Sequence, residues 1–319
     1  MLKLKADPWN PGYGAGAEAP FEGEATEVVT DPAVETTDWL EPLSPRPCPD
    51  EPVGFVDGVM RIDLRVLAQE DDRRAWGLLG SYGAGGVLCN GSASFADNPL
   101  IGRVMVLGGR MTSPPLELTV GATALAYATR SVSVDAPQEQ RRTLQRLMLE
   151  AEQRMAMRLA TEGWLVFADG PLHLKTAGDL PVVGVVKRMV TAYLEGTEAA
   201  LLPRLSPGQR SPVFALGNGV IDRYAWYQRL IPSNGLWHEL AGLVRCEVRM
   251  EMGVDEARRV ADRTACILPD FAGRPGIDPR APQNLTPVGA LETRLRHLLG
   301  HPVVIRRALQ SHLAGGGSS

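Results

Sequence analysis

The sequence predicts an α/β fold built on a mixed, partly antiparallel β-sheet. Three β-rich segments follow one another with short connections between residues 53 and 109, which favours an antiparallel meander. A long helical pattern occupies residues 136–161, and an apolar segment of strand length follows it directly. Because further strands and helices are mixed through the rest of the chain, the class is α/β.

The first β-rich segment reads VGFVDGVMRIDLRV and begins near Val53. It is either a hairpin that turns at Asp57-Gly58, since Asp-Gly is a common hairpin turn, or one strand that carries Asp57 at its end. Residues 76–90 and 101–109 are two further strand patterns.

Residues 136–161 change to helical spacing. Apolar side chains recur there at intervals of three and four residues, namely Leu144, Leu147, Met148, Ala151, Met155 and Leu159. The helix should end near Gly163, where the strand-like segment WLVFADGPLHL begins, and that strand should end at Asp169-Gly170-Pro171.

The remaining elements are shorter. VVGVVKRM predicts a strand that leads toward a helix at YLEGTEAALL, and residues 211–231 and 240–252 predict strands. Residues 254–265 predict a helix with two acidic residues in its first turn, where the helix dipole favours negative charge. A final helix is expected over 288–299, between Pro287 and Gly300.

Charge is distributed unevenly along the 319 residues, whose formal net charge is −4. Residues 1–50 hold ten acidic and three basic residues, a charge of −7, and eight of the 25 prolines, so the rest of the chain is +3. Mild positive charge permits a polyanion partner without requiring one. We expect an extended acidic arm over 1–50, disordered or laid over the body or contacting a partner, then a folded body over 51–313 and a disordered tail over 314–319.

The cellular compartment is predicted from what the sequence lacks. Its four cysteines show no CxxC spacing, and the start of the chain has no apolar signal-peptide region. No apolar run reaches the roughly 20 residues of a membrane helix. These features predict a cytoplasmic protein with reduced cysteines and no membrane partner.

Two aspartates stand where apolar strands would not be expected to carry charge. Asp57 and Asp169 each follow an apolar run and precede glycine. Burying a carboxylate is expensive unless it is paired or metal-bound, and two such groups on neighbouring strands can share a divalent cation. The alternative is that each Asp-Gly is a simple turn.

Glu152 is a third unusual acidic residue, because helical spacing places it on the apolar face between Met148 and Met155. A charged group there either completes a cluster with the two aspartates or lies at the boundary and pairs with an arginine. Asp and Glu clusters bind Mg²⁺ or Mn²⁺, and two such ions about 4 Å apart can hydrolyse a phosphodiester. The sequence has no Gly-rich phosphate loop, HExxH or GxSxG, which argues against nucleotide motors, zinc proteases and α/β hydrolases.

Taken together, these segments resemble the NurA nucleases. The similar stretches occur in the family's order and are GFVDGVMRIDLR, LEAEQRMAMRLATEGWLVFADGPL, VVGVVKRM, RYAWYQRL, LVRCEVRM and NLTPVGALETRLRHLLG. The resemblance implies an RNase H-like mixed β-sheet flanked by helices and a Mn²⁺- or Mg²⁺-dependent DNA nuclease with exonuclease and single-strand endonuclease activity. It further implies a homodimer that acts with a HerA-type hexameric ATPase in DNA end resection and double-strand break repair.

The resemblance also assigns roles to residues of this sequence. It implies that Asp57, Glu152 and Asp169 are catalytic and hold the metal, and that Arg61 and Lys187 contact phosphate. RNA cleavage by the same cluster is a second possibility for the substrate.

The last helix departs from the family pattern, in which a histidine completes the site. His297 lies off the apolar stripe, whereas Glu292 lies on it between Val288 and Leu295. We therefore expect Glu292 to be the fourth group of the site, as a metal ligand or close to the ligands, with His297 or no fourth ligand as the alternatives. Arg188 is a further candidate for phosphate contact, with a solvated surface charge as the alternative. The departure keeps a second hypothesis open, in which the chain is a nuclease-like subunit that binds DNA or a motor without cutting.

Overall fold

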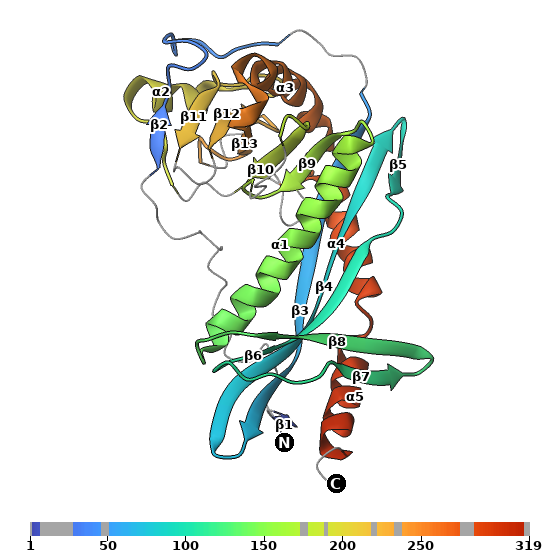
Figure 1. Ribbon diagram of the computed structural model, residues 1–319. Coiled ribbons are helices and arrows are strands. Elements are labelled where there is room, and N and C mark those ends of the chain that lie inside the picture. Colours follow the sequence, from blue (N-terminus) through green and yellow to red (C-terminus); the bar gives the residue numbers. More distant parts are fainter. Residues whose placement is uncertain are drawn as a thin grey trace.

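A mixed sheet with helices on both faces organises the chain (Figure 1). The computed structural model describes residues 2–6, 28–45, 51–172, 178–187, 191–217, 222–232, 238–274 and 284–315. Within these residues the sheet has 13 strands, in the order β2-β11-β12-β13-β10-β9-β3-β4-β6-β8-β7, with β1 paired to β3 and β5 to β4. None of the helices in these ranges is long and apolar enough to cross a membrane.

The elements fall into a strand-rich first half and a mixed second half. The first half comprises β1 (Lys3–Ala6), β2 (Val29–Asp31), β3 (Val53–Glu70), β4 (Arg73–Asn90), β5 (Ser92–Phe95), β6 (Leu100–Leu107), β7 (Leu116–Val120), β8 (Thr123–Ser131) and α1 (Pro137–Thr161). The second half comprises β9 (Leu165–Asp169), β10 (Val182–Val186), α2 (Gly196–Leu201), β11 (Phe214–Gly217), β12 (Arg223–Arg229), β13 (Leu243–Arg249), α3 (Val254–Ile267), α4 (Thr286–Leu298) and α5 (Pro302–Gly315).

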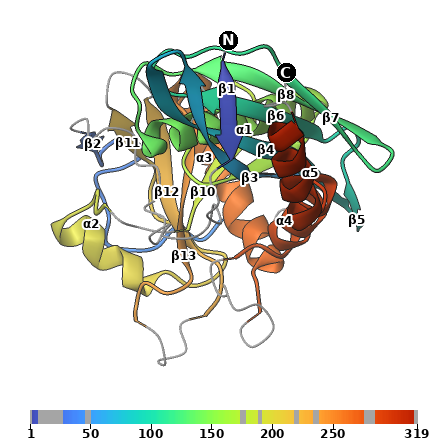
Figure 2. The ribbon, with the colours of Figure 1, turned by 90° about the horizontal axis from the view of Figure 1, so that it is seen from below.

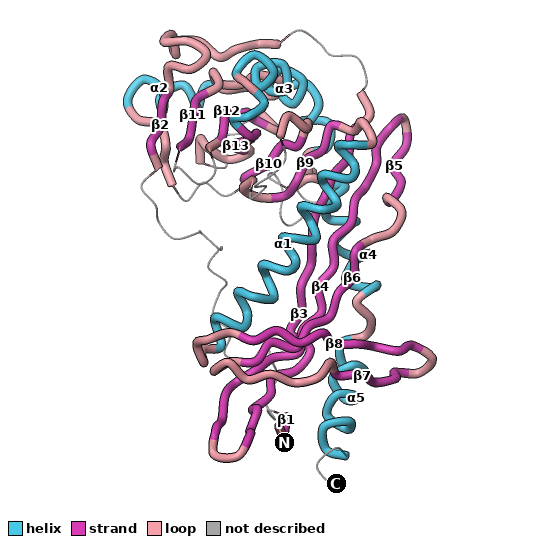
Figure 3. Tube along the Cα trace, in the orientation of Figure 1, coloured by secondary structure: helices cyan, strands magenta, loops and turns pink. Residues whose placement is uncertain are grey.

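Strands β3 and β4 form a long antiparallel hairpin that connects the two ends of the molecule (Figure 3). β3 is one strand of 18 residues, and Asp57-Gly58 lies inside it. Asp57 is paired with Gly85, and Gly58 with Ala84. Both predictions for this segment, a turn at Asp57-Gly58 and a strand that ends at Asp57, are therefore wrong, because β4 provides a continuous ladder partner that overrides the local turn preference.

Helices α1 and α4 pack against opposite faces of the hairpin, with α1 in front of it and α4 behind it in Figure 1. The glycines of β4 allow this close approach. A Cβ atom on Gly80 would lie 2.6 Å from Leu144 Cδ2 of α1, and one on Gly85 would lie 3.1 Å from Leu291 Cδ1 of α4. The sequence GSYGAGG thus makes a thin strand that two helices can approach at once.

The hairpin strand β3 and its two neighbours on the other side, β9 and β10, run parallel to one another. Phe55 of β3 is paired with Phe167 of β9, which in turn is paired with Val183 of β10. β9 pairs with β3 only as far as Val56, so β3 continues beyond the end of its neighbour. The carboxyl end of β9, and that of β10 next to it, therefore lie close to Asp57 near the start of β3, and the ends of parallel strands are where a sheet presents side chains to a ligand.

The helices predicted over 136–161, 254–265 and 288–299 are confirmed as α1, α3 and α4, with ends shifted by a few residues. The segment predicted as one strand over 211–231 contains two strands, β11 and β12. The hairpin of β7 and β8 and the helix α5 were not predicted. Since α5 continues to Gly315, the predicted tail begins too early, and residues 316–319 lie outside the described part.

Two described pieces of the predicted acidic arm are strands of the sheet. β1 pairs with Val66–Gln69 of β3, and β2 pairs with β11. Trp39, in the segment that follows β2, is 3% exposed and packs against Phe214. The predicted boundary at residue 50 therefore does not separate these pieces from the folded body.

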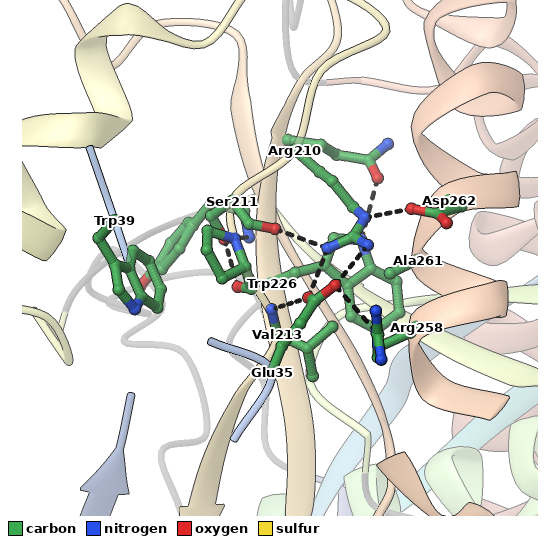
Figure 4. A network of polar contacts seen from close by, with 12 residues as sticks. Glu35, Trp39, Arg210, Ser211, Val213, Trp226, Arg258, Ala261 and Asp262 are labelled. Carbon is green, nitrogen blue, oxygen red and sulfur yellow. Dashed lines mark hydrogen bonds and ion pairs between the residues drawn. The ribbon is translucent and has the colours of Figure 1, made fainter. Parts of the chain in front are cut away.

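Glu35 fixes the second piece of the arm to the body (Figure 4). Its carboxylate accepts hydrogen bonds from Arg210 Nη1 at 2.8 Å, from the Val213 N–H at 2.7 Å and from Arg258 Nε at 3.1 Å. Arg210 also contacts Asp262 of α3 at 2.6 Å. The arm, the start of β11 and α3 thus share one ionic network, in which Glu35 and Arg210 are buried.

The Glu35 network should make stability depend on pH. Burial by itself would raise the pKa of Glu35, but Arg210, the Val213 N–H and Arg258 together hold this pKa below its ordinary value. A lowered folded-state pKa contributes stability above the unfolded value, and this stability is lost as pH falls through the folded-state pKa. We expect Glu35→Ala to lower the free energy of unfolding by about 3 kcal/mol at pH 7, because it leaves Arg210 buried without its carboxylate.

Urea unfolding of wild type and Glu35→Ala at pH 7 and at pH 3 measures this effect, and the difference between them should shrink at the lower pH. Glu41→Ala is the matched control, because Glu41 lies on the same arm and pairs with Arg204 but its side chain is 79% exposed. Its expected cost is below about 0.5 kcal/mol. A Glu35→Ala difference that does not change with pH would contradict the assignment.

Candidate functional site

Asp57 and Asp169 lie side by side on one face of the parallel strands. Val56 of β3 is paired with Ala168 of β9, so the next residue of each strand points to the opposite face, where Phe55 and Phe167 also pack. This environment changes the pKa of Asp57. Burial raises the pKa of Asp57 most, and the charges of Asp169 and Glu292 raise it further, to about 8.

One carboxylate oxygen of Asp57 is an unsatisfied hydrogen-bond acceptor in the described structure. The residue is 8% exposed, and its Oδ2 atom is buried without a hydrogen-bond partner among the described residues. The Gly58 N–H and the Lys187 ammonium lower its pKa, but they do not outweigh burial and the neighbouring carboxylates. A buried, unpaired carboxylate oxygen is costly, so this position favours a cation.

Glu152 reaches the same place from α1, on the other face of the sheet. It can do so because Gly58 has no side chain: a Cβ atom there would lie 2.9 Å from both Glu152 Cγ and Met148 Cγ. Burial raises the pKa of Glu152 well above its ordinary value, and Asp57 and Asp169 raise it further. Glu152 is thus electrostatically coupled to both aspartates.

Lys187 closes one side of the cluster. It follows β10, whose Val185 is paired with Asp169, and its Nζ atom lies 2.7 Å from Asp169 Oδ1. The two side chains are 17% and 25% exposed, respectively. This ion pair is therefore the part of the cluster that is most accessible to a ligand from solvent.

Glu292 contributes from α4. Its side chain is 13% exposed, its Oε2 atom lies 3.0 Å from Arg296 Nη2, and its charge raises the pKa of Asp57. His297, five residues further on, is exposed. Of these two candidates for a fourth ligand, Glu292 is therefore the one that faces Asp57.

Arg61, which the resemblance predicts to contact phosphate, has three partners within the protein. Its Nη1 donates to the carbonyl oxygen of Gly300 at 2.8 Å, its Nη2 to that of Leu299 at 3.3 Å, and its Nε lies 2.7 Å from Asp63 Oδ1. These carbonyls end α4, where the helix dipole favours a cation. Arg61 thus holds α4 against β3, and contact with phosphate would require these bonds to break. Arg188, the other arginine candidate, lies outside the described residues.

The role of Gly58, which leaves the space through which Glu152 approaches β3, was not predicted from the sequence. Glu247 of β13, a fully buried carboxylate, was not predicted either. The signal for Glu247 was present in the sequence LVRCEVRM, where apolar and charged residues alternate and one face of the strand is charged.

The fit of this site to a divalent cation depends on its donor atoms. Within the described ranges, no three Asp, Glu, His or Cys side chains are already arranged as a metal-ligand set. The donors present are carboxylate oxygens, which hard cations such as Mg²⁺ and Mn²⁺ prefer, and Asp57 Oδ2 is a buried oxygen without a partner. The donor chemistry fits such a cation, and its binding must be accompanied by movement of these side chains.

The fold and the site define a mixed α/β protein with neighbouring carboxylates at the point where β9 ends beside β3. No protein-family profile and no curated protein sequence matches the chain. Among solved structures it is similar to that of the NurA nuclease from Sulfolobus solfataricus, with a TM-score of 0.43 and 12% identity over 77% of this chain and 82% of the other. A likeness of this size does not assign the chain to a family, so function has to be argued from the site.

Proposed function

We propose that the chain is a divalent-metal-dependent deoxyribonuclease. Mn²⁺ or Mg²⁺ would be held by Asp57, Glu152 and Asp169, with Glu292 as the fourth ligand. The observation that carries the proposal is Asp57, whose buried Oδ2 has no partner in the described structure and whose pKa is raised by burial and by two neighbouring carboxylates. A divalent cation would satisfy this oxygen and neutralise the cluster at the same time.

We propose an RNase H-like core for the same site. In support, the central part of the sheet has the order β6-β4-β3-β9-β10, with β3, β4 and β6 antiparallel and β9 and β10 parallel to β3. The helix α1 joins the antiparallel part to β9. This arrangement places Asp57 on the central strand and Asp169 on its parallel neighbour.

The residues of the site would divide the work of phosphodiester hydrolysis. When bound, the metal supplies positive charge for the phosphate oxygens and acidifies the attacking water. Asp57 and Asp169 would hold the cation at their face of the sheet, and Glu152 would hold it from the α1 side. Lys187, once released from Asp169, would contact the backbone phosphate from the accessible side of the cluster.

From the resemblance we also propose exonuclease and single-strand endonuclease activity in DNA end resection and double-strand break repair. The cytoplasmic homodimer would act with a HerA-type hexameric ATPase. One observation favours the alternative of a non-catalytic subunit that binds DNA or a motor. Lys187 already neutralises Asp169, so the described residues can balance part of their charge without metal.

A digestion assay tests the proposed activity. We expect the purified full-length chain to cut linear DNA with Mn²⁺ and to lose this activity in EDTA. Asp169→Asn should lower the rate at least ~100-fold, because it weakens the site for the cation. Glu150→Gln is the matched control, since Glu150 lies on α1 close to Glu152 but is 51% exposed.

Each possible result has a distinct meaning. Cleavage that survives EDTA, or that Asp169→Asn leaves unchanged, would contradict the proposed site. DNA binding without cleavage would support the non-catalytic alternative, and preferential cutting of an RNA competitor would identify RNA as the substrate.

A further inference from the structure

We propose that Glu247 is a positioning residue that fixes the turn following β9 and so holds Asp169 toward Asp57. Glu247 lies on the face of the sheet opposite to Asp169, because it is paired with Gly184, which is paired with Ala168. It therefore acts on the site through the backbone of the turn. The catalytic consequence rests on the proposed function, whereas the anchoring of the turn does not.

Glu247 is a fully buried carboxylate with three donors. It is 0% exposed and accepts hydrogen bonds from the Leu172 N–H at 3.1 Å, from Arg223 Nη1 at 2.9 Å and from Arg245 Nε at 2.8 Å. Burial by itself would raise its pKa, but the charges of Arg245 and Arg223 and the Leu172 N–H hold the pKa below its ordinary value. The group is therefore an ionised acceptor, which makes a stronger hydrogen bond with the turn than a neutral one.

Gly184 provides the opening through which this contact is made. It lies on β10 between β9 and β13, and a Cβ atom there would lie 2.9 Å from the Leu172 nitrogen and 3.0 Å from the Gly170 carbonyl oxygen. The turn can fold back over β10 only because this position has no side chain. The Leu172 N–H then reaches Glu247, 75 residues further along the chain.

The other end of the turn is fixed as well. The Gly170 N–H donates to the Val185 carbonyl oxygen at 2.9 Å, and Gly170 has φ = 94°, a conformation that favours glycine. Leu172 is 2% exposed and packs with the buried face of α1. Asp169 therefore precedes a turn that is held at Gly170 and at Leu172, and Glu247 provides the second of these two anchors.

Two variants test this role in the full-length chain. Glu247→Gln keeps the size of the side chain but removes its charge, and Gly184→Ala leaves Glu247 intact but places a methyl group against the turn. In both we expect faster amide exchange in the peptide that contains Leu172, and weaker binding of Mn²⁺ by ~10-fold or more, since residues that support metal ligands typically have effects of this size. Mn²⁺ binding is measured by electron paramagnetic resonance without substrate.

Glu251→Gln is the matched control. Glu251 follows the same strand, but its side chain is 53% exposed and pairs with Arg249 in place of the turn. We expect unchanged Leu172 exchange and unchanged Mn²⁺ affinity in this variant.

The outcomes distinguish the anchoring of the turn by Glu247 from its effect on the position of Asp169. Unchanged exchange at Leu172 in Glu247→Gln and Gly184→Ala would overturn the anchoring. Lower thermal stability with unchanged Mn²⁺ affinity would overturn the positioning role, because Glu247 would then be structural only. A wild-type chain that binds no Mn²⁺ would overturn the proposed function, whereas exchange at Leu172, measured without metal, would still test the anchor.

Discussion

Replacing Asp57 by asparagine is expected to abolish metal-dependent cleavage and, without metal, to stabilise the fold. Asparagine has nearly the same shape but carries no charge, so it removes the repulsion from Asp169 and Glu292 that raises the pKa of Asp57. It also removes the desolvation penalty of a carboxylate whose Oδ2 atom is buried without a partner in the described structure. We expect a loss of cleavage of at least ~1,000-fold and a gain of about 1–3 kcal/mol in the free energy of unfolding in EDTA.

Thermal unfolding in EDTA and in Mn²⁺ measures both parts of this prediction. Mn²⁺ should stabilise the wild type, because a ligand that binds only the folded state shifts the equilibrium toward it, and it should have little effect on Asp57→Asn. Asp63→Asn is the matched control. Asp63 is 2% exposed on the same strand, but its carboxylate accepts hydrogen bonds from Arg61, Ser81 and Tyr127, so its replacement should destabilise the fold. If Asp57→Asn destabilises the metal-free protein as Asp63→Asn does, Asp57 is a satisfied structural group.

Local pattern was sufficient to locate most elements and to single out the three carboxylates. The spacing of Leu144, Met155 and Leu159 predicted α1, because these residues lie on one face of a helix and are buried. Asp57 and Asp169 stood out because each follows a run of core residues. The structure places Glu152 in electrostatic contact with both, while their roles as metal ligands stay a prediction.

Local pattern failed where a distant partner decides the outcome. Asp57-Gly58 has the composition of a turn, yet it continues a strand because residues on β4 complete its ladder. The contacts of Arg61 with the carbonyl oxygens of Leu299 and Gly300, just after α4, could not be predicted either, because these partners are more than 200 residues away in the chain. Neither contact has a signature within a short window of sequence.

The composition of residues 1–50 predicts an acidic, extended segment but not where it lies on the protein. Residues 1–50 are proline-rich and acidic, which is typical of an extended segment. Specific contacts fix the position of the described part over residues 28–45: β2 pairs with the edge strand β11, and Glu35 neutralises Arg210. A few specific contacts thus outweigh an average property of the whole segment.

Gly58→Ala is expected to damage the site and the fold together. The added methyl group would overlap Glu152 and Met148, so α1 must move away from β3 or Glu152 must turn away from Asp57. We expect a loss of about 1–3 kcal/mol in the free energy of unfolding, as is typical of overpacking in a core. Mn²⁺ should bind at least ~10-fold more weakly, because one ligand no longer reaches the cluster.

Gly80→Ala is the matched control that separates the loss of stability from the loss of Mn²⁺ affinity. Gly80 also faces α1, and a Cβ atom there would lie 2.6 Å from Leu144 Cδ2, two helical turns before Glu152. This variant should lose a similar amount of stability in urea unfolding yet keep its Mn²⁺ affinity, because its overlap involves only apolar atoms and the backbone. If Gly58→Ala also binds Mn²⁺ as the wild type does, Glu152 is not a ligand. The narrow gap at Gly58 would then serve only the packing of α1, and the metal would depend on Asp57, Asp169 and Glu292.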